Sequence, residues 1–144
     1  MLFVCVENAC RSLMAEAIFN ADPPAGWTAI SAGTRPAAAP NPRTAPMLAE
    51  LGVRMPPHSP LPLAPEVLSS AQLRVTMGCL DDASCPARLK TLELRDWALP
   101  DPARLDDAGF RRVRDEIAAN VRALHRELAT SPRQPAEVRR GAPQ

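Results

Sequence analysis

The chain has little aromatic content and no tyrosine, which leaves little surface for stacking against a planar ligand. Its formal net charge is only +1, so it lacks the basic surface of a nucleic-acid-binding protein. No apolar run approaches the roughly 20 residues that span a bilayer, and the N-terminus lacks the pattern of a signal peptide. We therefore expect a cytoplasmic protein that binds neither nucleic acid nor membrane.

Cysteines are too few for a disulfide scaffold. The four are Cys5, Cys10, Cys79 and Cys85, and in the cytoplasm reactive or metal-binding roles are more common for such residues. The length of 144 residues and the hydrophobic content of 46% suit one domain with its own core. We expect residues 1–131 to form that domain and residues 132–144 to be a polar tail.

The most informative stretch lies at the start of the chain. A short apolar strand over Leu2–Val6 brings Cys5 to its end, and a polar loop leads to Arg11 and Ser12, where a helix opens that runs to near Asn20. A loop of this length can turn its backbone N–H groups toward a tetrahedral oxyanion, and the helix N-terminus also favours an anion. The arginine adds a planar fork of donors, and the positive field favours the cysteine thiolate, a nucleophile.

The plain alternative is a buried cysteine at the end of a strand, and for Cys5 alone that interpretation would be preferred. The complete unit, a strand followed by C-x5-R-S and a helix, is much more specific. The sequence therefore predicts a thiolate held against a bound oxyanion.

The rest of the chain alternates between strand and helix patterns. Further strands are expected at Trp27–Ala32, Leu73–Met77 and Thr91–Arg95, and helices at Pro42–Leu51 (capped by Asn41), at Pro65–Ser70 and from Asp106 or Asp107 through Leu128. This alternation predicts an α/β fold with a parallel sheet covered on both faces. Ligands of such sheets bind at the carboxyl ends of strands, where Cys5, Ser31, Cys79 and Asp101 are expected to meet.

The second cysteine pair, Cys79 and Cys85, lies in a stretch rich in turn-forming residues. In a continuous helix their Cα atoms would be about 9 Å apart, beyond the ~7 Å limit of an unstrained disulfide, so a bridge needs a loop or an unwound helix. A mobile surface segment suits thiols that change partners. Two alternatives remain open: a structural zinc held by the four cysteines, for which the spacings are poor, and incidental free thiols.

Several short motifs together resemble one family. They are Cys5, Asn8, Cys10, Arg11 and Ser12, the SAGT at Ser31–Thr34, Cys85-Pro86 and Asp101-Pro102. With these, the chain resembles the low-molecular-weight protein tyrosine phosphatases and, within them, the thioredoxin-coupled arsenate reductases. The resemblance covers about Leu2–Leu128 and implies a three-layer fold, a four-stranded parallel sheet flanked by helices.

The resemblance also implies roles for the residues of the first loop. Cys5 would be the nucleophile, Arg11 the oxyanion clamp, Ser12 the hydroxyl that stabilises the thiolate, and Asn8 the residue that holds the loop's unusual backbone. Asp101 would donate a proton to the leaving oxygen, although an Asp-Pro pair is also a common turn. The expected oxyanion-binding residues are Glu7, Asn8, Ala9, Cys10, Arg11 and Ser12. The Glu7 side chain is expected to point to solvent while its backbone serves the anion.

The two cysteines outside the loop favour a reductase. Reducing arsenate to arsenite takes two electrons, and the resemblance implies a relay in which Cys5 attacks arsenate, Cys79 attacks Cys5, and Cys85 attacks Cys79. Cys10 is expected to have no part in this relay. Ala103 and Arg104 follow the Asp-Pro where the tyrosine phosphatases of the family have aromatic residues. The alternatives are a phosphatase that hydrolyses phosphomonoesters through a Cys5 phosphocysteine, and a non-enzymatic arsenic or zinc binder.

The partners implied are an arsenate- or phosphate-like oxyanion and an external thiol reductant, with no tightly bound cofactor or metal and a monomeric chain. The Cys79–Cys85 gap is one residue shorter than is typical of thioredoxin-coupled members, so thioredoxin and a low-molecular-weight thiol both remain possible reductants. Related reductases can bind potassium behind the loop, and Asn8, Glu16 and Ser31 match part of that site. The two histidines, His58 and His125, are expected to be solvated and without an acid–base partner.

Overall fold

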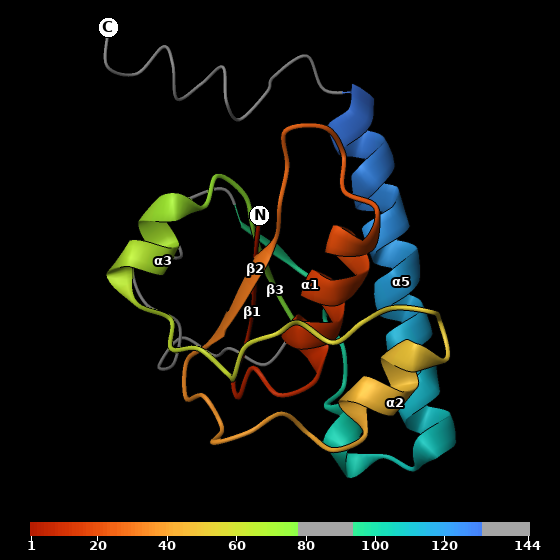
Figure 1. Ribbon diagram of the computed structural model, residues 1–144. Coiled ribbons are helices and arrows are strands. Elements are labelled where there is room, and N and C mark those ends of the chain that lie inside the picture. Colours follow the sequence, from red (N-terminus) through yellow and green to blue (C-terminus); the bar gives the residue numbers. More distant parts are fainter. Residues whose placement is uncertain (78–93, 131–144) are drawn as a thin grey trace, which may run out of the picture.

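Four short parallel strands form the centre of the molecule, side by side in the order β2-β1-β3-β4 (Figure 1). The structure is a computed structural model and describes residues 1–77 and 94–130. Its elements are β1 (Leu2–Cys5), α1 (Arg11–Ala21), β2 (Ile30–Gly33), α2 (Thr44–Ala49), α3 (Pro65–Ser70), β3 (Arg74–Thr76), β4 (Leu94–Asp96), η1 (Pro102–Arg104) and α5 (Asp107–Thr130). The expected α/β fold with a parallel sheet is confirmed.

Strand β1 is buried on both faces, and its side chains alternate between two apolar clusters. Phe3 and Cys5 pack in the cluster that includes side chains of α1 and α5, whereas Leu2 and Val4 pack against Leu68 of α3. Figure 1 shows α3 on one side of the sheet and α1 with α5 on the other. Since alternate residues of a strand point to opposite faces, this arrangement gives three layers.

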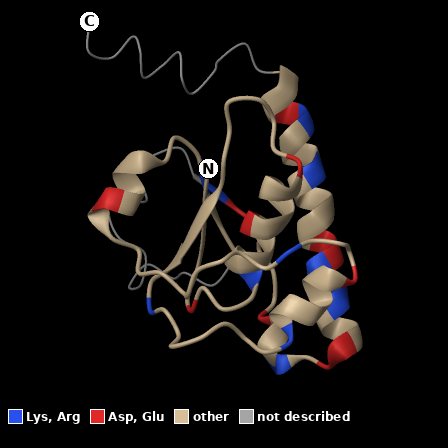
Figure 2. Cartoon of the chain, viewed as in Figure 1, with Lys and Arg blue, Asp and Glu red and all other residues tan. Residues whose placement is uncertain are grey.

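Helix α5 supplies the longest apolar stripe of the fold. Its buried apolar side chains recur every three or four residues and are Phe110, Val113, Ile117, Ala118, Val121, Leu124 and Leu128. Asp106 caps the helix, since its Oδ1 accepts a hydrogen bond from the N–H of Gly109 at 2.8 Å. Figure 2 shows that charged residues recur along α5 and that the strands carry few charges. No helix in the described part of the chain is both long and apolar enough to cross a membrane.

Two of the expected elements begin two or three residues later than the sequence indicates. The strand expected from Trp27 begins at Ile30, because the register pairs Ile30 with Leu2, the first residue of β1, and no strand residue is available for an earlier pair. The helix expected from Pro42 begins at Thr44, and Asn41 caps a turn instead, since its Oδ1 accepts from the N–H of Arg43 at 2.9 Å.

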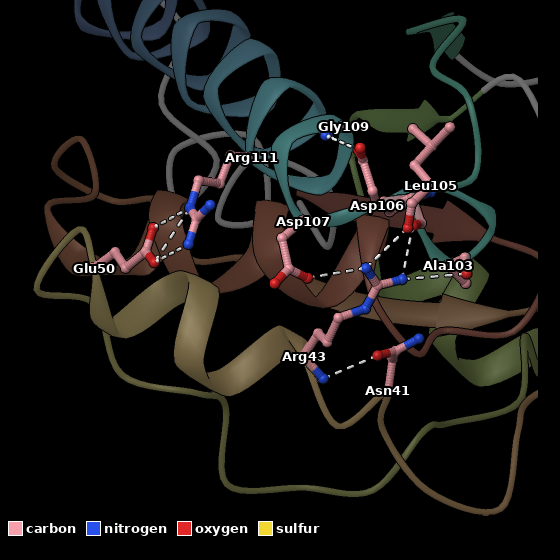
Figure 3. Close-up of polar contacts among 10 residues, drawn as sticks. Asn41, Arg43, Glu50, Ala103, Leu105, Asp106, Asp107, Gly109 and Arg111 are labelled. Carbon is pink, nitrogen blue, oxygen red and sulfur yellow. Dashed lines mark hydrogen bonds and ion pairs between the residues drawn. The ribbon is translucent and has the colours of Figure 1, made fainter.

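Helices α2 and α5 are joined by a charged cluster around Glu50. Its carboxylate accepts hydrogen bonds from Arg111, at 2.9–3.3 Å, and from Arg114, whose Nη1 also donates to the carbonyl of Met47. Figure 3 shows the contact between Glu50 and Arg111. The hydrogen bonds from Arg111 and Arg114, in that order, outweigh the small effect of burial and lower the pKa of Glu50 from 4.5 to about 2.

This cluster makes stability depend on pH. The lowered pKa means that Glu50 stabilises the folded chain fully above about pH 4.5 and that this contribution is lost as the pH falls toward 2. We expect Glu50→Gln to lower the melting temperature at neutral pH and the difference from wild type to vanish near pH 2. Thermal unfolding followed by circular dichroism measures this, with Glu116→Gln, which removes an exposed carboxylate of α5, as the control. A difference that stays constant across this range would contradict the assignment.

Candidate functional site

The loop between β1 and α1, called here the anion loop, has its carbonyl groups turned outward. The carbonyl oxygens of Val6, Glu7 and Ala9 accept hydrogen bonds from backbone N–H groups within residues 35–41 at 2.8–3.0 Å. The described peptide bonds are trans, so the N–H that follows each carbonyl points the opposite way. The N–H groups of Glu7 and Cys10 therefore face the inside of the loop, which is the arrangement that an oxyanion requires.

Cys5 lies at the bottom of this loop and is 2% exposed. Its Sγ accepts a hydrogen bond from the backbone N–H of Asn8 at 3.2 Å and lies 2.9 Å from the Oγ of Ser12. The Asn8 side chain donates to that same Oγ at 2.7 Å, so the Ser12 hydroxyl is left to donate its own proton to the sulfur. Two donors directed at one sulfur stabilise its charged form.

Asn8 fixes the shape of the anion loop. It has a φ of +52°, the left-handed region that asparagine tolerates better than most residues. Its Oδ1 accepts from the N–H of Leu61 at 2.9 Å and its Nδ2 also donates to Ser31 at 2.9 Å. Gly33 of β2 allows the loop to lie this close to the sheet, because a Cβ there would be 2.5 Å from the carbonyl oxygen of Val6.

Arg11, the first residue of α1, is buried, and its guanidinium is held through Nη1. Nη1 donates to the carbonyls of Met77 at 3.2 Å and Leu99 at 2.9 Å, which lie at the ends of the strands beyond β1. Nε is buried and has no hydrogen-bond partner among the described residues. A buried donor without a partner is costly, and the edge formed by Nε and Nη2 matches two oxygens of a tetrahedral anion.

Asp101 reaches the same cavity from the far side. Its Oδ1 accepts a hydrogen bond from the N–H of Ala103 at 3.0 Å and a weak one from the thiol of Cys10 at 3.8 Å. Burial, followed by the charges of Cys5 and Asp101, raises the pKa of Cys10 to about 12. Cys10 therefore stays a protonated thiol at neutral pH, which suits a donor to a carboxylate and not a nucleophile.

Most of the expected site residues line one cavity of about 620 Å³. Of the anion loop they include Cys5, Glu7, Ala9, Cys10 and Arg11, and Asp101 joins them from the turn after β4. Glu7 is exposed, as expected for a side chain that points to solvent. Asn8 and Ser12 lie behind the loop, fully buried. No aromatic side chain of the described residues lines the cavity.

The expectation that Ser31 joins this cavity is wrong. Its hydroxyl lies behind the anion loop, where it accepts from Asn8 and donates to the buried carboxylate of Glu16 at 2.6 Å. Ser31 is within β2, not after it, so its side chain points to one face of the sheet. The structure therefore gives Ser31 a supporting contact with the loop.

The expectation that His58 has no acid–base partner is also wrong. Its Nε2 lies 2.9 and 3.0 Å from the two carboxylate oxygens of Glu16, and its Nδ1 lies 2.8 Å from the carbonyl of Ser59. Burial lowers the pKa of His58, but the hydrogen bonds to Ser59 and Glu16 and the charge of Glu16 outweigh it, so the pKa is raised. The two partners are 42 residues apart, and no local pattern links them.

The contacts of Glu16 also determine whether a potassium ion fits behind the anion loop. Asn8, Glu16 and Ser31 do meet behind the loop, through hydrogen bonds of 2.6–2.9 Å. Both carboxylate oxygens of Glu16, however, are already held by the His58 ring. A cation would have to displace that ring, so the residues present do not fit a resident potassium ion.

His125 is not a solvated side chain of the polar face of α5. Its ring packs edge-on against Phe19 of α1, with centroids 4.8 Å apart, and its Nε2 is buried without a partner among the described residues. Position 125 is one turn beyond Val121 and next to Leu124, at the edge of the apolar stripe. The periodicity of the helix therefore indicated that the His125 side chain lies at the edge of the buried face.

Two contributions to the site were missed at the sequence level. The hydroxyl of Thr44 donates to the carbonyl of Ala9 at 2.8 Å, and the side chain of Arg43 donates to the turn that follows Asp101. Both residues fall within a segment expected to be plain helix, and nothing in their spacing indicates these long-range partners. Cys79 and Cys85 lie outside the described residues. Within residues 1–77 and 94–130, no group of three His, Cys, Asp or Glu side chains could hold a metal ion.

Comparison with known proteins agrees with this geometry. The family model described as low molecular weight phosphotyrosine protein phosphatase matches residues 1–134. Arsenate reductase 1 of Staphylococcus epidermidis is 33% identical over 119 residues, which are 83% of this chain and 89% of that protein.

Solved structures of similar proteins point the same way. The arsenate reductase of Archaeoglobus fulgidus is 35% identical with a TM-score of 0.72, covering 85% of this chain and 96% of its own. The thioredoxin-dependent arsenate reductase Cg_ArsC1' of Corynebacterium glutamicum is 31% identical with a TM-score of 0.72, covering 88% of this chain and 59% of its own.

Proposed function

Because the chain belongs to the low-molecular-weight phosphotyrosine protein phosphatase family, we propose that it is an arsenate reductase that uses a thiol reductant. One observation supports this most directly: the Cys5 sulfur lies in an anion loop whose N–H groups face inward, and Arg11 lines the same cavity. Residues 1–131 are taken as one catalytic domain and residues 132–144 as a tail.

The reaction begins at the anion loop. The Cys5 thiolate attacks the arsenic atom of arsenate, and a sulfur–arsenic bond forms. An arsenic–oxygen bond breaks, and Asp101 donates the proton with which that oxygen leaves as water. Among the described residues, the Asp101 carboxyl is held through Oδ1, which accepts from Cys10 and Ala103. The loop N–H groups and Arg11 stabilise the charge on the remaining oxygens.

The two electrons come from thiols. The Cys79 thiolate attacks the Cys5 sulfur, a Cys5–Cys79 disulfide forms, and the sulfur–arsenic bond breaks with its electron pair left on arsenic, which departs as arsenite. Cys85 then attacks Cys79, which releases Cys5 as a thiolate and leaves a Cys79–Cys85 disulfide. An external thiol reductant returns that disulfide to two thiols. Cys10, held as a thiol beside Asp101, has no part in the relay.

The cavity favours arsenate over an aromatic phosphoester. Its described wall includes several alanine and proline side chains and two exposed arginines, Arg35 and Arg104, and contains no aromatic ring for stacking. Hydrolysis through a Cys5 phosphocysteine uses the same loop and is the competing activity. It needs neither Cys79 nor Cys85, and this difference makes the two activities separable.

The reductant is a protein of the thioredoxin type or a low-molecular-weight thiol. The Corynebacterium relative is described as thioredoxin-dependent, and we favour thioredoxin on that ground. A relay that starts from free thiols works in a reducing compartment, so we propose that the enzyme is cytoplasmic. We also propose that it is a monomer.

The proposal is tested by turnover with arsenate. With thioredoxin, thioredoxin reductase and NADPH we expect arsenate-dependent loss of NADPH absorbance. We expect Cys79→Ser to abolish this turnover while leaving the binding of phosphate unchanged, because the anion loop is intact and only the second electron donor is missing. Binding of phosphate is measured from the melting temperature as a function of its concentration.

Two controls make the result decisive. A low-molecular-weight thiol system replaces thioredoxin in a parallel assay, so silence in both assays overturns the reductase. Hydrolysis of para-nitrophenyl phosphate is measured on the same samples. If Cys79→Ser keeps full hydrolysis and the wild type reduces no arsenate, the chain is a phosphatase.

A further inference from the structure

The turn that carries Asp101 is short and has few contacts of its own. It consists of η1, in which the N–H of Arg104 donates to the carbonyl of Asp101 at 3.2 Å and that of Leu105 donates to Pro102 at 3.0 Å. Asp101 is half-buried, and Ala103 and Arg104 are exposed. A carboxyl on such a turn needs support from elsewhere if it is to keep a fixed position over the anion.

Arg43 supplies this support from a distant part of the chain. Its Nη2 donates to the carbonyls of Pro102 at 3.1 Å and Ala103 at 3.2 Å, and its Nη1 donates to the carbonyl of Leu105 at 2.9 Å. Figure 3 shows this guanidinium among the carbonyls of the turn. It also lies 4.8 Å over the ring of Phe110, at the start of α5. One planar group thus binds three carbonyls within four residues, a match to the fork geometry of arginine.

The link from Arg43 to the Asp101 carboxyl is one peptide group long. The carbonyl of Pro102 accepts from Arg43, and the N–H of the same peptide, which belongs to Ala103, donates to Asp101 Oδ1 at 3.0 Å. The two ends of a trans peptide point in opposite directions, so the three groups form a continuous chain. Hydrogen bonds in such chains polarise one another, and each fixes the orientation of the next.

The segment that carries Arg43 is also attached to the anion loop. The N–H of Asn41 and the hydroxyl of Thr44 both donate to the carbonyl of Ala9, at 3.0 and 2.8 Å. The N–H of Arg43 donates to Asn41 Oδ1 at 2.9 Å. Arg43 therefore stands between the loop that holds the nucleophile and the turn that holds the acid. It does not itself line the cavity.

We propose that Arg43 is a positioning residue that holds the Asp101 carboxyl at the distance from the Cys5-bound anion at which it can give up its proton. This inference rests on the proposed function, since it assigns Asp101 the role of acid in arsenate reduction. It goes beyond that function by naming the side chain that couples the two halves of the site.

The test is a double-mutant cycle on arsenate turnover. Arg43→Met keeps an unbranched apolar side chain and removes the donors. We expect it to lower kcat by about 10- to 100-fold while KM for arsenate changes by less than about 3-fold, since only the proton transfer is misplaced. Asp101→Asn lowers kcat by about 10²-fold. In the Asp101→Asn protein, adding Arg43→Met should lower kcat by less than about 2-fold, because the group that Arg43 positions is already gone.

The matched control is Arg111→Met, which removes another arginine that joins α5 to the α2 region but does not touch the turn. We expect it to leave kcat and KM unchanged. Melting temperatures of all variants are compared, and if Arg43→Met does not fold, Arg43→Lys takes its place in the cycle. Lysine keeps the charge but not the fork, so it should restore part of kcat.

The outcomes distinguish a failure of the positioning role of Arg43 from a failure of the proposed function. Additive losses in the double mutant, or a rise in KM equal to the fall in kcat/KM, overturn the positioning role while arsenate turnover by the wild type upholds the proposed function. An Asp101→Asn protein with wild-type kcat overturns the inference in the same way. A wild type that reduces no arsenate overturns the proposed function and this inference with it.

Discussion

Replacing Cys5 by serine is expected to abolish arsenate turnover, with a fall in kcat on the order of 10⁴-fold or more. Serine keeps the size and the hydrogen bonds of the site but is a hydroxyl that does not ionise near neutral pH. The two donors at the Cys5 sulfur, the N–H of Asn8 and the hydroxyl of Ser12, stabilise a charged atom that serine cannot supply. The steady-state rate of NADPH consumption measures the loss.

The same variant should still bind an oxyanion. The N–H groups of the anion loop and the edge of Arg11 do not depend on the sulfur, so phosphate should raise the melting temperature of Cys5→Ser at least as much as that of the wild type. A Cys5→Ser protein that kept more than about one hundredth of the wild-type kcat would exclude Cys5 as the nucleophile. Retained turnover would then direct attention to the cysteines outside the described residues.

Arg11→Lys is expected to have the second-largest effect, a fall in kcat/KM for arsenate of about 10²- to 10³-fold. Lysine keeps the positive charge but loses the Nη1 contacts with Met77 and Leu99 that aim the side chain. It also loses Nε, which is buried without a hydrogen-bond partner among the described residues. A flexible point charge cannot replace a fixed planar fork at a site where two oxygens are bound at once.

Two measurements check this assignment. Initial rates over a range of arsenate concentrations give kcat/KM, and melting temperatures in phosphate give the change in anion binding. We expect phosphate to stabilise Arg11→Lys much less than the wild type. Arg112→Lys, a change at an exposed position of α5, is the control for general effects of the substitution. If Arg11→Lys kept wild-type values in both measurements, the clamp would have to be another residue.

Local sequence patterns predicted most of the fold. Helix α3 has the predicted bounds, Pro65–Ser70, because a proline marks its start and the segment after it was predicted to be a strand. The apolar run of β1 and the periodicity of α5 placed those elements to within one or two residues. The errors arose at Trp27 and Pro42, where the length of a neighbouring strand or the geometry of a turn decides the boundary.

The same distinction between local and long-range contacts applies to the residues of the site. The spacing of Cys5, Arg11 and Ser12 is local, and their positions around one loop followed from it. His58, which contacts Glu16, and Pro102, which accepts from Arg43, each lie more than 40 residues from their partner in sequence, and only the fold brings these pairs together. Single charged side chains such as Glu16 and Arg43 follow no periodic pattern. A single sequence therefore offers no means of assigning their long-range hydrogen-bond partners.

The central claim is that electrons pass from Cys85 through Cys79 and Cys5 to arsenate, so that the disulfide moves from Cys5–Cys79 to Cys79–Cys85. It is tested most directly by mapping disulfides with mass spectrometry after one turnover of the reduced protein with arsenate, without external reductant. The account predicts a Cys79–Cys85 disulfide with Cys5 and Cys10 free in the wild type, and a trapped Cys5–Cys79 disulfide in Cys85→Ser. Four free thiols after exposure to arsenate, or a Cys5–Cys10 disulfide as the main product, would contradict it.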